Sequence, residues 1–130
     1  MLSQLLLPLL REKFADRGLV TGEPPEPCAV FPGTHPGIRR VAIYDDGDEL
    51  TVSVDDLTHG HFAEYTEGLS ESERAERVVE SVVEFLTALF ADEVVVWGQH
   101  EVRGGWYRPA FGGSGGRTGV REFVWSGPRA

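Results

Sequence analysis

Two histidines and two aspartates lie within seven residues of this chain, in the stretch Asp55-Asp56-Leu57-Thr58-His59-Gly60-His61. Imidazole is the side chain most readily recruited for metal binding or proton transfer near neutral pH. His59 and His61 are two positions apart, so on an extended backbone both imidazoles project to the same side. With carboxylates close by, this spacing is typical of two ligands of a Zn²⁺ or Fe²⁺ site.

A metal site of this kind needs at least one further ligand. The candidates in the sequence are Asp55, Asp56, Glu64, His35 and His100. The alternative interpretation is that Gly60 marks a turn and that the two histidines cap, pack or lie in solvent. We therefore expect no cofactor, with a divalent metal such as zinc as the alternative.

Other chemical signals in the sequence are weak. His100 and Glu101 are neighbours, and adjacent residues on a strand point in opposite directions. The glycine-rich run 112–116 lacks the Gly-Lys-Ser/Thr ending of a phosphate loop, so it predicts a hairpin connection. Cys28 has no adjacent base or cation, which indicates an unreactive thiol. The sequence thus leans toward a protein that is not an enzyme.

The last third of the chain combines aromatic and arginine residues, a composition typical of binding hot spots. Trp106, Tyr107 and Arg108 are the predicted partner-binding residues. The alternative is that these side chains serve cross-strand packing within a sheet.

The charge distribution narrows the choice of partner. The net charge is −9, and residues 39–92 carry fourteen acidic and four basic side chains, a balance of −10. Such a surface repels phosphate backbones, which argues against a nucleic-acid ligand and favours a basic protein partner. The alternative is that the charge only confers solubility.

The cysteine count and the N-terminal segment bear on location. A single cysteine fits a reducing compartment. The leucine-rich start lacks a basic flank and a small-residue cleavage site, and it is shorter than the roughly 20 residues that span a bilayer. We expect a cytoplasmic protein without membrane contact.

The hydrophobic pattern predicts one α+β domain over residues 1–130, in the order α-β-β-α-β-β-β. Residues 1–38 are expected to form a helix over 3–16, a stiff connector over 21–27 and an irregular segment over 31–37. Residues 39–130 are expected to contain the sheet and the main helix. A hairpin over 39–54 is followed by a loop and by a helix over 70–91, with Ser70 and Glu73 at capping-box spacing.

Three more strands are expected, namely a central one over 94–97, an edge strand over 106–111 that contains Pro109, and a last one over 120–125. A flexible loop over 112–119 should separate the last two. Together these elements predict an antiparallel sheet of about five strands with two helices mainly on one face. His59-Gly60-His61 is expected at the junction between sheet and helix, where loops carry function.

These observations favour a small, acidic, non-catalytic protein that acts by protein–protein interaction, with homodimer formation as a further expectation. In size, charge and helix-on-sheet pattern the chain is similar to bacterial accessory proteins such as immunity proteins. The alternative from the histidine pair is a metal-dependent enzyme or metal-binding protein. A third hypothesis is a small-molecule binder with a pocket between helix and sheet.

Overall fold

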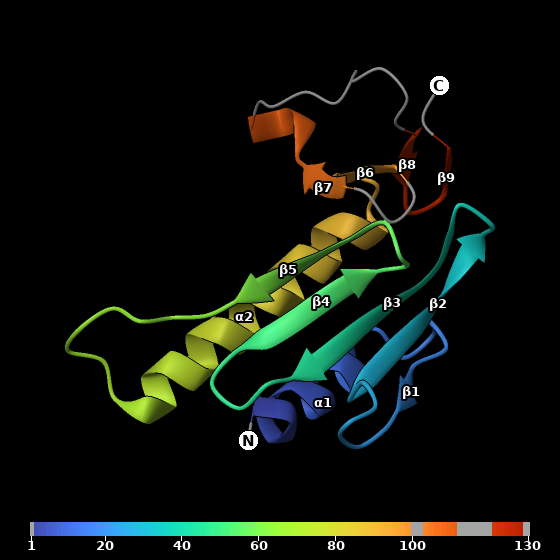
Figure 1. The fold of residues 1–130 in the computed structure, drawn as a ribbon. Coiled ribbons are helices and arrows are strands. Elements are labelled where there is room, and N and C mark those ends of the chain that lie inside the picture. The colour runs from blue at the N-terminus through green and yellow to red at the C-terminus, as the bar shows by residue number, and fades with distance from the viewer. Residues whose placement is uncertain (1, 100–102, 112–120, 129–130) are drawn as a thin grey trace.

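Two α-helices, a five-stranded antiparallel sheet and a smaller four-stranded sheet make up the protein (Figure 1). The computed structural model describes residues 2–99, 103–111 and 121–128. The larger sheet has the order β1-β2-β3-β4-β5, and both helices lie behind it in Figure 1. The predicted α+β class, with two helices and an antiparallel sheet of five strands, is confirmed.

Alternating burial explains how the larger sheet carries the core on one face. Its strands are β1 (Val20–Thr21), β2 (Ala29–His35), β3 (Ile38–Asp45), β4 (Leu50–Val54) and β5 (Thr58–Phe62). Val41 pairs with Val54 and Ile43 with Val52, and all four side chains are fully buried. The predicted hairpin over 39–54 is therefore confirmed, and its inner face packs against the helices.

Helix α2 (Glu71–Phe90) begins at a complete capping box. The Ser70 hydroxyl accepts from the backbone N–H of Glu73 at 3.1 Å, and the Glu73 carboxylate accepts from the backbone N–H of Ser70 at 3.4 Å. Its apolar side chains recur at steps of three and four and are buried, as the sequence predicts. The opposite side is exposed and rich in glutamate.

Helix α1 (Leu2–Lys13) buries Leu2, Leu6 and Leu10 along one stripe. The predicted first helix over 3–16 is present, and Pro8 lies well inside it. Pro8 is exposed, so the backbone N–H that it lacks belongs to the outer side of the helix. Asp45 Oδ2 accepts from the backbone N–H of Ser3 at 2.8 Å, and its negative charge suits this helix N-terminus.

The smaller sheet has the order β7-β6-β8-β9 and lies beyond the C-terminal end of α2 (Figure 1). Its strands are β6 (Val95–Gln99), β7 (Arg103–Tyr107), β8 (Arg121–Val124) and β9 (Gly127–Pro128). Strand β6 lies between β7 and β8, and Val95 and Val96 are buried, so the predicted central strand is confirmed.

An aromatic cluster connects both helices with both sheets. Phe14, which follows α1, packs edge-to-face on Phe31 of β2 and Phe90 of α2, with ring centroids 5.9 and 5.1 Å apart. Phe90 in turn meets Trp125, beyond β8, at 4.9 Å. The core is thus continuous from the first helix to the second sheet.

Several expected segments differ in the structure. Residues 31–37 are mostly strand, because β2 accommodates its proline and glycine through an irregular register between Pro32 and His35. Residues 58–62 form strand β5 rather than a loop, since they pair with all of β4. Pro109 begins a 3₁₀ helix, η1 (Pro109–Phe111), after β7 has ended. The loop predicted over 112–119 lies outside the described residues.

The strands expected in one sheet are divided between two, because β5 pairs with β4 and the three later strands form a separate sheet with β9. No helix in the described ranges is long and apolar enough to cross a membrane.

Candidate functional site

The histidine pair lies on β5, which ends the larger sheet. His59 pairs with Ser53 and His61 with Thr51 of β4, so both imidazoles project from the face opposite the core. Both are exposed, and their ring centroids are 5.4 Å apart at an interplanar angle of 82°. The structure therefore places the two imidazoles on the same face of the strand, as their spacing in the sequence predicts.

The surroundings of His61 are polar. Its Nδ1 atom lies 2.9 Å from the Thr51 hydroxyl and 3.8 Å from Glu49 Oε2. Thr51 also donates to the Asp46 carboxylate. The imidazole of His61 is therefore held by groups of the β3–β4 turn and of β4.

Asp55 and Asp56 bind an arginine instead of facing the histidines. Asp55 accepts from the backbone N–H and the guanidinium of Arg39, both at 2.7 Å, and its side chain is only 7% exposed. Asp56 lies 3.8 Å from the same guanidinium. Burial raises the pKa of the Asp55 carboxyl, but the hydrogen bonds from Arg39 and from the Asp56 backbone N–H outweigh it and hold the pKa below its usual value.

The other candidate ligands also have different environments. His35 Nδ1 accepts from the backbone N–H of Gly37 at 3.1 Å, which leaves Nε2 to donate to the carbonyl of Val124 at 3.2 Å. Glu64 lies 3.9 Å from the Arg77 guanidinium. His100 lies outside the described residues.

Within residues 2–99, 103–111 and 121–128, no group of three or more histidine, cysteine or acidic side chains is placed to hold a metal ion. The histidine pair therefore supplies two potential ligands there, and the divalent metal site stays a prediction.

The three predicted partner-binding residues all make contacts within the chain. Trp106 packs on Phe85 with ring centroids 4.5 Å apart. Tyr107 donates to Glu122 at 2.8 Å, and Arg108 donates twice to Glu84, at 2.7 and 2.5 Å. These hydrogen bonds raise the pKa of Arg108 and lower that of Glu84. Partner binding by these residues stays a prediction, and the structure shows their packing role.

Cys28 is buried beside the larger sheet. Its removal from water raises the pKa of the thiol to about 11, and the nearby Asp45 adds to the effect. A thiol that holds its proton this strongly is a poor nucleophile at neutral pH.

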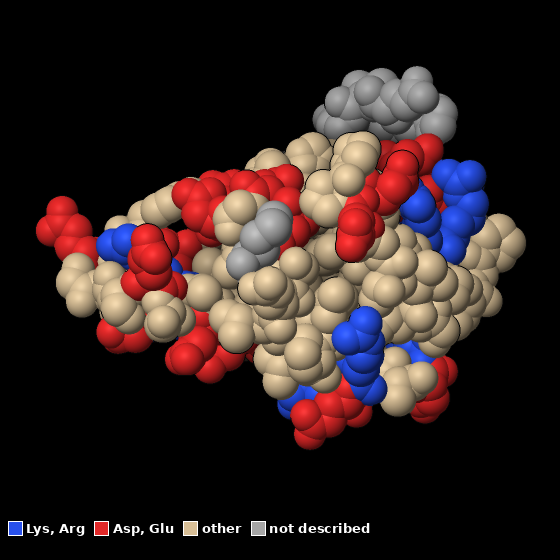
Figure 2. Space-filling view, turned by 90° about the horizontal axis from the view of Figure 1, so that it is seen from below, with Lys and Arg blue, Asp and Glu red and all other residues tan. Residues whose placement is uncertain are grey.

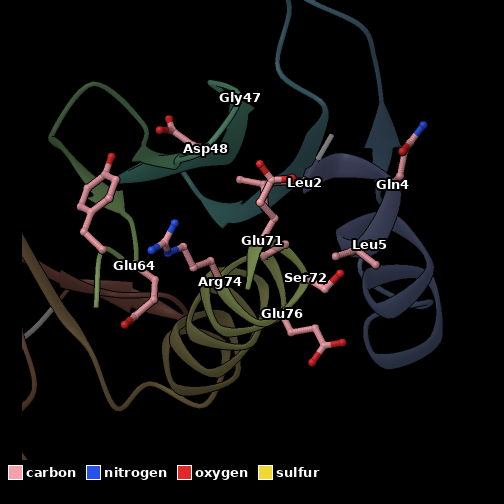
Figure 3. A pocket seen from close by; sticks show the side chains of 12 residues that line it. Leu2, Gln4, Leu5, Gly47, Asp48, Glu64, Glu71, Ser72, Arg74 and Glu76 are labelled. Carbon is pink, nitrogen blue, oxygen red and sulfur yellow. The ribbon is translucent and has the colours of Figure 1, made fainter. Parts of the chain in front are cut away.

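A pocket lies where the N-terminal ends of both helices meet two loops (Figure 3). No sequence motif predicts this pocket. Its volume is about 650 Å³. The β3–β4 turn contributes Gly47 and Asp48, and the segment after β5 contributes Glu64 and Tyr65. The two helices supply the remaining lining residues, which are Leu2, Gln4, Leu5, Glu71, Ser72, Arg74, Ala75 and Glu76. The one sequence signal related to this pocket is the excess of acidic residues over 39–92.

The side chain of Arg74 points toward the side of this pocket that Asp48 and Glu64 line (Figure 3). Its Nε atom is buried and has no hydrogen-bond partner among the described residues. Its Nη2 atom reaches the carbonyl of Thr66 at a long 3.5 Å. The Nε atom is closed to a ligand, so only the outer Nη atoms of this guanidinium can donate into the pocket.

Negative charge surrounds that arginine. Four carboxylates line the pocket against one guanidinium. Figure 2 shows acidic groups gathered toward its left end, the end at which Figure 1 places the start of α2. This end of the molecule therefore combines a hollow with a strongly acidic surround.

No family model, no curated protein and no solved structure matches the chain.

Proposed function

We propose that this protein is a non-catalytic binding protein whose acidic surface along α2 takes a basic protein partner. The observation that carries the proposal is a row of glutamates on the exposed side of the helix. Glu76, Glu80 and Glu84 recur every four residues and so share one face. Of these three glutamates, only Glu84 has an ion-pair partner, Arg108, within the described part of the chain.

Charge complementarity gives this row its role. Uncompensated carboxylates on one face raise the local concentration of a basic partner and accelerate its association. The row runs from the pocket at the start of α2 toward the smaller sheet, so one partner surface could contact both. The buried thiol, with its raised pKa, supports the non-catalytic part of the proposal.

The test compares capture by the wild-type chain with capture by Glu76→Gln/Glu80→Gln. Glu12→Gln/Glu26→Gln is the matched control, because both residues are exposed acids outside α2. We expect a discrete protein that binds the wild type and the control, is released by salt and is lost with the α2 variant. A strict monomer that retains no protein, or a protein that all three forms retain equally, would contradict the proposal.

We also propose a cytoplasmic location and self-association as a second mode of binding. The free, buried Cys28 supports the location, because reducing compartments favour unpaired thiols. Light scattering tests the second point, since a constant mass of 14.3 kDa at all concentrations would contradict a homodimer.

The metal-binding alternative has one observation in its favour, the 5.4 Å separation of the two imidazole rings on β5. Metal analysis of protein purified without a histidine tag tests it. Stoichiometric metal that His59→Ala and His61→Ala remove would support a site. Substoichiometric metal, with no thermal shift on addition of Zn²⁺, Fe²⁺ or Mn²⁺, would exclude it.

A further inference from the structure

We propose that the pocket between the helix N-termini binds a basic α-amino acid unit with a free carboxylate, its carboxylate on Arg74 and its side-chain cation among the surrounding acids. This ligand site shares Glu76 with the acidic row on α2 but alone contains Arg74, so Arg74→Met distinguishes failure of this proposal from failure of protein binding. Lysine and arginine, free or as the last residue of a peptide, belong to this chemical class.

The first step of the argument is the unsatisfied guanidinium. Arg74 has no carboxylate within ion-pair distance in the described part of the chain, although four acidic residues line the same pocket. Its buried Nε lacks an acceptor, and its hydrogen bond to Thr66 is long. The Nη atoms of a guanidinium form a planar pair of donors that matches a carboxylate, so a ligand carboxylate is the group that suits Arg74.

The second step is the charge around that guanidinium. Asp48, Glu71 and Glu76 line the pocket, and their side chains have no hydrogen-bond or ion-pair partner among the described residues. A simple anion would be repelled by these carboxylates, and a diamine would be repelled by Arg74. A ligand with one carboxylate and more than one cationic group satisfies both requirements.

The third step is the apolar part of the lining. Leu2, Leu5 and Ala75 come from the two helices, and Leu5 is 44% exposed. The methylene chain of lysine or arginine can lie along such a surface while its charged end reaches a carboxylate. Tyr65 is fixed by a 2.6 Å hydrogen bond to Glu49 and adds a ring to the wall. The volume of about 650 Å³ lies within the usual range for small-molecule pockets.

The experiment is calorimetric titration of the chain without an N-terminal tag, because the first turn of α1 lines the pocket. The probes are L-lysine, L-arginine and the tripeptide Gly-Gly-Lys. Two control ligands lack a free carboxylate: cadaverine has none, and in lysine amide the carboxylate is replaced by an amide. We expect saturable binding of at least one probe, and at least about tenfold weaker binding of cadaverine and lysine amide, since hydrogen bonds to charged groups contribute this much. Free lysine that binds as well as the tripeptide identifies a free amino acid as the ligand, and preference for the tripeptide identifies a peptide C-terminus.

Variants locate the site. Arg74→Met should weaken binding about tenfold or more, whereas Arg40→Met, which removes an exposed arginine from β3, should leave it unchanged. Glu71→Gln/Glu76→Gln should weaken binding with Arg74 intact, and it covers the case in which Arg74→Met fails to fold. The proposal is wrong if no probe binds at millimolar concentration. It is also wrong if cadaverine binds as tightly as lysine, or if Arg74→Met, where folded, and the glutamine variant bind like the wild type.

Discussion

Replacement of Gly104 by alanine tests the contact that holds the histidine strand against the smaller sheet. A Cβ atom on Gly104 would lie 1.7 Å from the carbonyl oxygen of Leu57 and 2.8 Å from its carbonyl carbon. Real Cβ contacts do not fall below 3.0 Å, so the two backbones would have to separate by about 1.3 Å. Leu57 directly precedes β5, and its N–H donates to the carbonyl of Val54 at 3.1 Å, so this movement disturbs the start of the strand.

The structure sets the size of the expected effect. Overpacking lowers the free energy of unfolding by about 1–3 kcal/mol. We expect a loss of about 3 kcal/mol for Gly104→Ala, because its clash is between two backbone segments and no side chain can relieve it. For a chain of this size, the loss corresponds to a melting temperature lower by about 12 °C. The matched control is Gly127→Ala, where a Cβ meets nothing within 4 Å, and we expect a change within about 0.5 kcal/mol.

Urea unfolding followed by tryptophan fluorescence measures both variants, because Trp97 and Trp106 lie in the smaller sheet and Trp125 packs on Phe90. The imidazole NMR signals of His59 and His61 should also shift in Gly104→Ala and stay unchanged in the control. An unfolding midpoint for Gly104→Ala equal to that of the wild type would refute the close approach of β7 to Leu57.

Three further outcomes follow from the structure. The pKa of Asp55 is lower in the folded chain than its ordinary 3.8, so its ion pair with Arg39 stabilises the fold above that pH and is lost as the pH falls through the lower folded value. Asp55→Asn should therefore be less stable than the wild type at pH 7, and urea midpoints of the two should converge below about pH 4. Ser70→Ala should lower the free energy of unfolding by about 1 kcal/mol through loss of the capping box. Ser72→Ala, at the second residue of the helix, should have a smaller effect in the same urea titration. Burial raises the pKa of Cys28 to about 11, so a thiol reagent at pH 8 should label it slowly in the native protein and rapidly in urea; fast native labelling would contradict its burial.

The sequence predicted best those elements whose pattern is local. The hairpin over 39–54 and the helix after Ser70 follow from alternation, helical periodicity and a capping box, each of which acts within a few residues. Strand β2 was missed because Pro32 and Gly33 mark irregular structure in isolation. The larger sheet tolerates them through an irregular register, with the backbone at Gly33 so close to the carbonyl of Ile38 that no side chain would fit.

The candidate site was likewise predictable from the sequence only where its pattern is local. The common side of His59 and His61 follows from their spacing, because residues two apart on any strand share a face. The binding of Asp55 and Asp56 by Arg39 depends on a strand 16 residues earlier and leaves no local pattern. The pocket around Arg74 was also beyond sequence reasoning, since it joins two helix ends and two loops that only the fold brings together.

The two edges of the larger sheet bear on how the protein avoids aggregation. An exposed strand edge offers unpaired backbone groups on which another chain can add a strand. At one edge β1 is only two residues long and is soon followed by Pro24 and Pro25, which offer no backbone N–H. At the other edge, the residue before β5 lies against the backbone of β7. Neither edge of the larger sheet offers a long, flat template, so copies of this chain should resist joining through the edges of that sheet.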